Sequence, residues 1–224
     1  MLPTDRELEE LNENELYALA KEQLALKHYS IASSYLNTLN SKYPYNKNSE
    51  FSTSYAIYTN FMIREYEVVF NDAEYFQKIY PQSDMISWVK FMQAYSLVKQ
   101  TRSWTQDYLE SDFARNDITR FDLAYKILAS IIANDPASPY VAAAAKLQRL
   151  IVTILTEKEY LISKYYLEKN LPIAAANRVY ELIRNYPNSC FIGDALQVLD
   201  ASYDMLGLTS WSEQVRKVMR INNL

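Results

Sequence analysis

A short sequence motif recurs four times along the chain: a helix-length amphipathic segment ends in an aromatic or polar residue, and proline follows directly. Proline lacks an amide N–H and clashes with the preceding helical turn, so a helix ends at each copy of the motif. An Asn or Ser two residues after the proline can cap the helix that follows. The motif therefore predicts four helix-to-helix junctions, at Pro44, Pro81, Pro136 and Pro187.

Helical hairpins fill the intervals between these prolines. The first interval is close to one tetratricopeptide (TPR) repeat of about 34 residues, and the longer later intervals indicate insertions and lengthened helices. In the second helix of a repeat the apolar residues share one stripe, as Ala174, Ala175 and Ile183 do. We predict an all-α, TPR-like α-solenoid. Its five hairpins are expected at about residues 14–44, 49–81, 87–136, 140–187 and 190–222.

The third hairpin carries an irregular segment, Thr101–Arg120, that a short turn cannot accommodate. Apolar residues such as Trp104 and Phe113 make it too hydrophobic for a free linker, so we expect it to fold back on the solenoid. We divide the chain into repeats 1–3, within residues 1–136, and repeats 4–5, within residues 137–224.

Composition agrees with a helical repeat protein. Only 2 glycines and 7 prolines occur in 224 residues, so β-sandwiches, barrels and glycine-rich nucleotide loops lack their turn residues. A hydrophobic fraction of 49% is enough to form a core. A net charge of -4 disfavours nucleic acid as a partner. One His and one Cys, Cys190, cannot build a metal site from soft ligands, so we expect neither metal nor cofactor.

Residues for catalysis are sparse. His28 lies in the predicted turn of the first hairpin with no nucleophile motif nearby, and it fits better as a polar turn residue where a TPR usually has Gly or Asn. Glu157 and Glu159 can in principle do acid–base chemistry, but such pairs on a repeat helix are most often a solvated face. We predict no enzyme and no catalytic residue. A helical carbohydrate-active enzyme stays open as an alternative, and it requires a glutamate buried in a pocket.

Tyrosine is unusually abundant, with 20 residues in the chain. Tyr combines a large apolar ring with a hydroxyl that needs a partner, which suits both packing between hairpins and peptide recognition in a groove. First helices of hairpins line the concave surface of a solenoid. The groove candidates are the tyrosines expected on such helices: Tyr17, Tyr55, Tyr58 and Tyr95.

Residues 159–189, EYLISKYYLEKNLPIAAANRVYELIRNYPNS, carry a family pattern of E-x-x-I/V-A-x-Y-Y, a short turn, A-A-x-N-R and a final Y-P. In this segment the chain resembles the BamD (ComL) family of outer-membrane assembly lipoproteins, and the likeness extends over about residues 12–220. The family glycine between the fourth pair of helices is Asn170 here, which also tolerates left-handed conformations. The matching residues are Glu159, Tyr165, Tyr166, Ala174, Ala175, Asn177, Arg178, Tyr186 and Pro187.

This resemblance implies a non-catalytic lipoprotein on the periplasmic face of the outer membrane, within the β-barrel assembly (BAM) machinery. It implies that the C-terminal repeats bind the POTRA region of the barrel subunit BamA, and that other BAM lipoproteins are partners. The N-terminal repeats would receive unfolded outer-membrane proteins through their C-terminal β-signal. Membrane attachment would use only an N-terminal lipid anchor, whose cysteine is absent from this chain.

Arg178 is the leading candidate for the BamA contact, because it falls beside the apolar stripe of its helix and its guanidinium can fork onto a carboxylate. Asn177, Tyr166 and Glu181 are grouped with it. Two other interpretations stay open. Arg178 can instead pair with Glu181 at i+3 on the same helix. The whole chain can instead be a generic periplasmic TPR scaffold for another cell-envelope complex.

Overall fold

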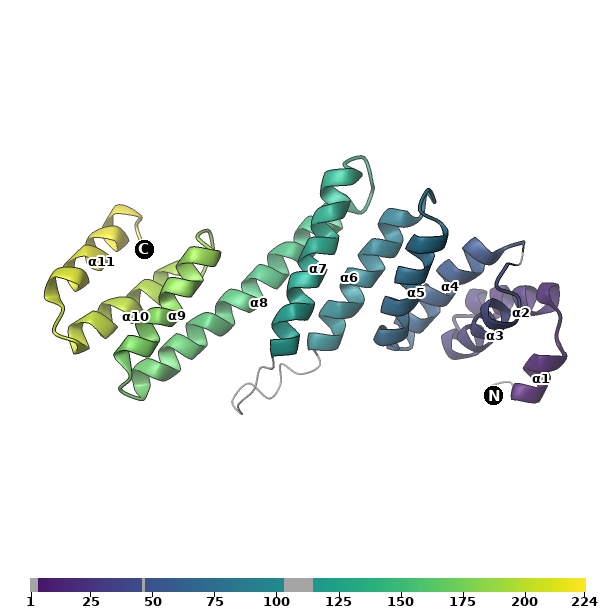
Figure 1. The fold of residues 1–224 in the computed structure, drawn as a ribbon, viewed down its shortest axis with the longest axis horizontal. Helices are drawn as coiled ribbons and strands as arrows, with labels where there is room; N and C mark the ends of the chain where they lie inside the picture. The colour runs from purple at the N-terminus through teal and green to yellow at the C-terminus, as the bar shows by residue number, and fades with distance from the viewer. Residues whose placement is uncertain (1–3, 46, 103–114) are drawn as a thin grey trace. The chain divides into compact units, whose positions relative to one another are not determined.

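The structure is a computed structural model, and it describes residues 4–45, 47–102 and 115–224. Within these ranges every regular element is an α-helix (Figure 1), which confirms the all-α prediction. The described helices, in chain order, are α1 (Asp5–Glu10), α2 (Glu13–Ala25), α3 (Tyr29–Lys42), α4 (Ser49–Met62), α5 (Tyr66–Ile79), α6 (Ile86–Arg102), α7 (Arg115–Asn134), α8 (Val141–Glu168), α9 (Pro172–Asn185), α10 (Ile192–Met205) and α11 (Thr209–Ile221).

Helices α2 to α11 form five successive pairs, α2/α3 to α10/α11, at the positions that the repeats predict. Each of the four predicted prolines lies between the second helix of one pair and the first helix of the next. The TPR-like solenoid of five hairpins is therefore confirmed. The lengthened helices expected in the later repeats are also present, since α8 has 28 residues whereas α9 has 14.

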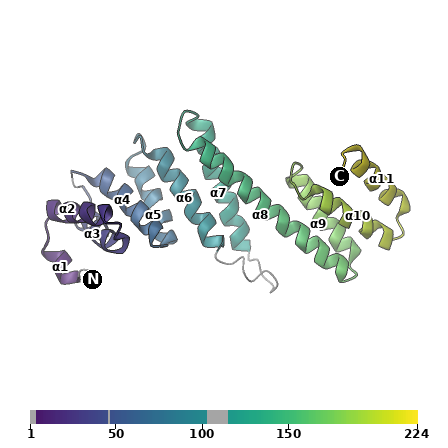
Figure 2. The same cartoon turned by 180° about the vertical axis from the view of Figure 1, so that it is seen from behind.

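The chain forms two compact units, residues 1–148 and residues 149–224, with the boundary inside α8. In the first unit each helix from α2 to α6 packs on the next one along the chain, and α4 also contacts α6. Figure 2 shows this succession from behind. In the second unit α10 packs on both α9 and α11. The functional division at 136/137 stays a prediction.

Small apolar clusters hold the first unit together, and each is built from neighbours in the chain. Leu8, Leu16 and Leu39 join α1, α2 and α3. Because Leu8 is buried there, it fixes α1, a helix that the repeat pattern does not predict. Burying one leucine contributes about 1.5–3 kcal/mol. The next clusters contain Ala20, Leu36 and Ala56, and then Ile57, Val69, Ala73, Phe76, Val89 and Met92.

One apolar cluster of the second unit joins its last three helices. Val179 and Leu182 of α9 meet Leu199 of α10 and Val215 of α11. Tyr166 of α8 packs at the edge of this cluster. Contacts between adjacent helices thus account for the core of each unit, as expected for a repeat protein.

Four hairpin turns share one geometry. The amide of the residue after the turn donates to the carbonyl five residues earlier, at 2.9 Å in all four cases. This is the Schellman ending, which needs one residue with a left-handed backbone. Those residues are Lys27 (φ 59°), Arg64 (φ 69°), Asn170 (φ 62°) and Gly207 (φ 69°). The left-handed conformation expected of Asn170 is confirmed. His28 was expected in the glycine position of the first turn, but Lys27 occupies it.

The irregular segment predicted at 101–120 is shorter than expected. Residues 101–102 belong to the end of α6, and helix α7 already begins at Arg115, so residues 115–120 are helical. Helix α7 therefore includes six residues that the prediction assigned to the irregular segment. The expectation that the segment folds back on the solenoid concerns residues 103–114, which lie outside the described residues.

A buried polar network joins the first two hairpins. Ser33 Oγ of α3 donates to Asn60 Oδ1 of α4 at 2.5 Å, and Asn60 Nδ2 donates to Asp72 Oδ2 of α5 at 3.2 Å. Asn37 Nδ2 donates to Ser33 Oγ at 3.2 Å. Burial raises the pKa of Asp72 above its usual value, while the hydrogen bond from Asn60 partly offsets this effect.

Candidate functional site

The four groove candidates lie on α2, α4 and α6, the first helices of the three hairpins in the first unit. Tyr17 of α2 and Tyr55 of α4 are near enough to interact electrostatically. Burial raises the pKa of the Tyr17 hydroxyl, and the neighbouring Tyr55 hydroxyl raises it further. Lys21 Nζ lies 5.5 Å from the centroid of the Tyr17 ring, within cation–π range. Both side chains are half-buried, so each packs partly into the core and remains partly accessible.

Tyr58 has a different neighbour. Its ring meets the ring of Tyr29, at the start of α3, edge to face, with centroids 5.7 Å apart and an interplanar angle of 83°. The hydrogen-bonding interaction with Tyr29 is the main cause that raises the pKa of the Tyr58 hydroxyl, and burial adds to it. Tyr58 is also the most exposed of the four candidates. It presents a paired and partly accessible aromatic surface.

Tyr95 belongs to a row of aromatic rings that the sequence did not single out. It stacks on Phe61 of α4, with centroids 5.0 Å apart, and it also meets Phe91 one turn earlier on α6. Phe91 in turn stacks on Tyr140 at 6.0 Å. The spacing of four residues between Phe91 and Tyr95 was visible in the sequence, whereas the partner Phe61 was not. Lys99 Nζ lies 5.2 Å above the Tyr95 ring.

The structure therefore brings Tyr17 and Tyr55 together and gives Tyr58 and Tyr95 separate aromatic partners. In each of the three groups a ring packs against apolar neighbours while remaining half-buried or exposed. Two of the groups carry a lysine above the ring. Such rings can stack on aromatic side chains of a peptide, and the lysines can meet a carboxylate.

In the second unit, Arg178 of α9 pairs with Glu159 of α8. The distance from Arg178 Nη1 to Glu159 Oε2 is 3.4 Å, and the side chains are 42% and 17% exposed. The alternative pairing with Glu181 is wrong in this structure, because Arg184 Nη2 lies 2.6 Å from Glu181 Oε2 and occupies that carboxylate. Arg178 thus remains accessible beside a carboxylate on the neighbouring helix.

The other three residues grouped with Arg178 differ in their surroundings. Asn177 is exposed. Tyr166 is half-buried against the core of the second unit, and its ring meets that of Tyr165 at 5.9 Å. Glu181 also accepts a hydrogen bond from Asn185 Nδ2 at 3.3 Å, which holds its carboxylate. The sequence identified Glu159 as a residue that matches the family pattern, but it did not predict that Glu159 pairs with Arg178.

Nothing in the described ranges groups three or more His, Cys, Asp or Glu side chains as a metal site. His28 is exposed, with its Nδ1 3.0 Å from Gln23 Oε1 in the turn before α3. Among the helices that the structure describes, none has the length and apolar character to cross a membrane.

Comparison with known proteins gives a consistent result. The model of the YfiO family, described as outer membrane lipoprotein, matches residues 9–218. The chain is 25% identical over 217 residues to the outer membrane protein assembly factor BamD of Pasteurella multocida, covering 97% of this chain and 84% of the relative. It is 26% identical to the BamD of Vibrio cholerae (94% and 88% covered) and 26% identical to that of Neisseria meningitidis serogroup A (92% and 78% covered).

The stacked helical hairpins and the accessible polar and aromatic side chains on them define a TPR-like repeat protein. Because the family model matches nearly the whole chain, this protein belongs to the YfiO family of outer membrane lipoproteins, the family of BamD. The resemblance seen in residues 159–189 is thereby confirmed.

Proposed function

We propose that this protein assists the assembly of outer membrane proteins by binding other proteins, without catalysis. The observation that carries this proposal is the match of residues 9–218 to the YfiO family, together with relatives named outer membrane protein assembly factor BamD. The proposed location is the periplasmic face of the outer membrane, with an N-terminal lipid as the anchor; the family description, outer membrane lipoprotein, supports the membrane and the lipid. Other lipoproteins of the BAM machinery are further proposed partners.

The second unit is the proposed binding surface for the POTRA region of BamA. Arg178 supports this assignment because its side chain is 42% exposed, and its only described ion pair is long, at 3.4 Å. A carboxylate of the partner can approach to about 2.8 Å and form a bidentate pair. Asn177 adds an exposed amide, and Tyr166 and Glu181 complete the surface.

The first unit is the proposed receiver of the β-signal of unfolded outer-membrane proteins. Such a signal ends in an aromatic residue with alternating apolar residues, and it lies at a chain terminus. Tyr17, Tyr55, Tyr58 and Tyr95 supply rings for stacking, and Lys21 and Lys99 sit over two of these rings. A lysine beside a stacking surface suits a terminal carboxylate that follows an aromatic side chain.

Binding between the purified chain and the purified POTRA domains of BamA from the same organism tests the proposal. Isothermal titration calorimetry should detect saturable binding of the folded POTRA domains, and an unrelated folded periplasmic domain titrated in the same buffer should give none. If the folded POTRA domains bind no more tightly than an unrelated periplasmic domain, the generic scaffold for another envelope complex takes the place of this proposal.

A further inference from the structure

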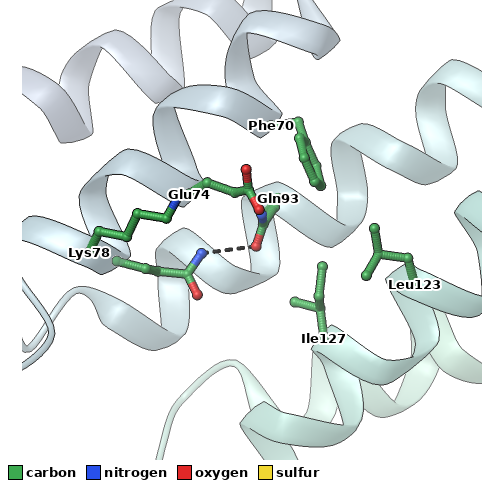
Figure 3. Close-up of a pocket in the computed structure, with 7 residues that line it drawn as sticks. Phe70, Glu74, Lys78, Gln93, Leu123 and Ile127 are labelled. Carbon is green, nitrogen blue, oxygen red and sulfur yellow. Dashed lines mark hydrogen bonds between the residues drawn. The ribbon is translucent and has the colours of Figure 1, made fainter.

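A hollow of about 300 Å³ lies between α5, α6 and α7 in the first unit (Figure 3). Phe70 of α5 and Leu123 and Ile127 of α7 form its apolar wall. Gln93 of α6 also lines the hollow. Because Gln93 and Tyr95 are two residues apart, they point about 200° apart around α6, so this hollow faces away from the aromatic row. It is distinct from both surfaces of the proposed function.

Two glutamines that line the hollow, Gln77 and Gln93, offer an amide oxygen and an amide nitrogen. Gln77 Nε2 donates to Gln93 Oε1 at 2.9 Å and to the Ala73 carbonyl at 3.0 Å, which uses both Gln77 donors. The Gln77 Oε1 acceptor and the Gln93 Nε2 donors have no partner within the described residues. An acceptor beside a donor is the pattern that a peptide group complements, because a peptide presents one N–H and one C=O.

The rim carries two opposite charges one helical turn apart, Glu74 and Lys78 of α5. Residues at i and i+4 on a helix are about 5–6 Å apart at Cβ. In an extended peptide, residues at i and i+2 are about 6.5 Å apart. A cation and an anion that flank one residue of an extended peptide therefore match the spacing of Glu74 and Lys78.

The volume is at the lower limit of about 300–1,000 Å³ that small-molecule pockets reach. It suits a single large apolar side chain of a longer ligand better than a whole small molecule. We propose that this hollow binds an extended peptide segment of a partner protein, with the pattern cation, large apolar residue, anion. The apolar side chain enters between Phe70, Leu123 and Ile127, and the two glutamines hydrogen-bond its peptide group.

Methyl NMR of the full chain with capped peptides of the form Ac-Ser-Gly-Lys-X-Glu-Gly-Ser-NH₂ tests this proposal. With X as leucine or phenylalanine, the peptide should shift the methyl signals of Leu123 and Ile127 in a saturable way. With X as alanine, or with the anchor amide N-methylated, the affinity should fall at least about fivefold. Equal binding of all these peptides, or no binding by any of them, overturns the proposal.

Two variants locate the site. Leu123→Ser should lower the affinity for the leucine peptide at least about fivefold, whereas Leu161→Ser should leave it unchanged. Both leucines are 40% exposed, so the two substitutions are matched in burial, and circular dichroism checks that each variant folds. Equal affinity of the two variants contradicts the site. Sedimentation velocity should show a monomer; a dimer that Leu123→Ser abolishes would assign the hollow to a second copy of the chain instead.

Discussion

Arg178 of α9 and Glu159 of α8 form an ion pair at 3.4 Å, which ties the fourth hairpin together while the arginine stays 42% exposed. An ion pair of this kind, half in solvent, contributes only about 0–1 kcal/mol to stability. A partner carboxylate with better geometry can therefore displace Glu159 at little cost in stability. This makes the pair a testable feature of the proposed POTRA surface.

The first prediction concerns Arg178. Replacing it with glutamate, Arg178→Glu, should weaken POTRA binding at least about tenfold, because the charge that meets the partner's carboxylate is reversed. Calorimetry measures the affinity, and the helical circular dichroism signal should persist. Arg120→Glu reverses an exposed arginine in the other unit and should leave the affinity unchanged. Unaltered binding of Arg178→Glu would remove Arg178 from the surface.

Glu159→Gln provides the complementary prediction. It removes the carboxylate that competes for the Arg178 guanidinium, so POTRA binding should tighten by up to about fivefold. This factor corresponds to the free energy of about one exposed ion pair. Thermal unfolding should change little, because the pair is partly solvated. A loss of affinity on Glu159→Gln would mean that Glu159 positions Arg178 for the partner instead of competing with it.

The β-signal surface gives a third prediction. A β-signal peptide with a photoreactive aromatic residue should crosslink within repeats 1–3, and labelling only beyond residue 140 would contradict the assignment. Tyr58→Ala should reduce crosslinking several-fold, because it removes one ring of the Tyr29 pair. Tyr75→Ala on α5 is the matched control, since Tyr75 and Tyr58 are 43% and 36% exposed.

The left-handed turns give a fourth prediction. A residue with a side chain in this conformation costs about 1 kcal/mol relative to glycine. Lys27→Gly and Arg64→Gly should therefore each raise the free energy of unfolding by about 0.5–1 kcal/mol, and Gly207→Ala should lower it by a similar amount. Urea denaturation measures all three. A loss of stability in both glycine variants would show that the lysine and arginine side chains make contacts worth more than the strain.

Asp72 gives a pH-dependent prediction. Burial raises its pKa in the folded protein above the ordinary 3.8, so the folded state disfavours the carboxylate that the unfolded chain carries freely. The free energy of unfolding should therefore fall as pH rises from 3.8 through the folded pKa. Asp72→Asn, which can still accept from Asn60, should be more stable than the parent at pH 7, and this gain should vanish below pH 3.8.

The control for Asp72 is Asp84→Asn, at an exposed position. It should shift stability by the same small amount at both pH values, as urea denaturation at each pH measures. If Asp72→Asn destabilises the chain at pH 7, then the charge of Asp72 is worth more to the network of Ser33 and Asn60 than its burial costs.

The helices and their junctions were predictable because they depend on neighbours in the chain. Pro44, Pro81, Pro136 and Pro187 each end a helix by a local clash and a missing N–H, whatever surrounds them. The left-handed Asn170 was predictable for the same reason. The first turn was harder, because the Schellman bonds place the left-handed residue at Lys27, one position before the expected His28.

The sequence by itself determined the all-α class, the five hairpins and the family, since these follow from local patterns and from the motif at 159–189. Only the tertiary structure decided which side chains meet. Glu159 is 19 residues from Arg178, whereas the expected partner Glu181 lies on the same helix and pairs with Arg184. Likewise Phe61 reaches Tyr95 only because α4 packs on α6. Contacts between helices depend on their relative rotation and distance, which no local pattern contains.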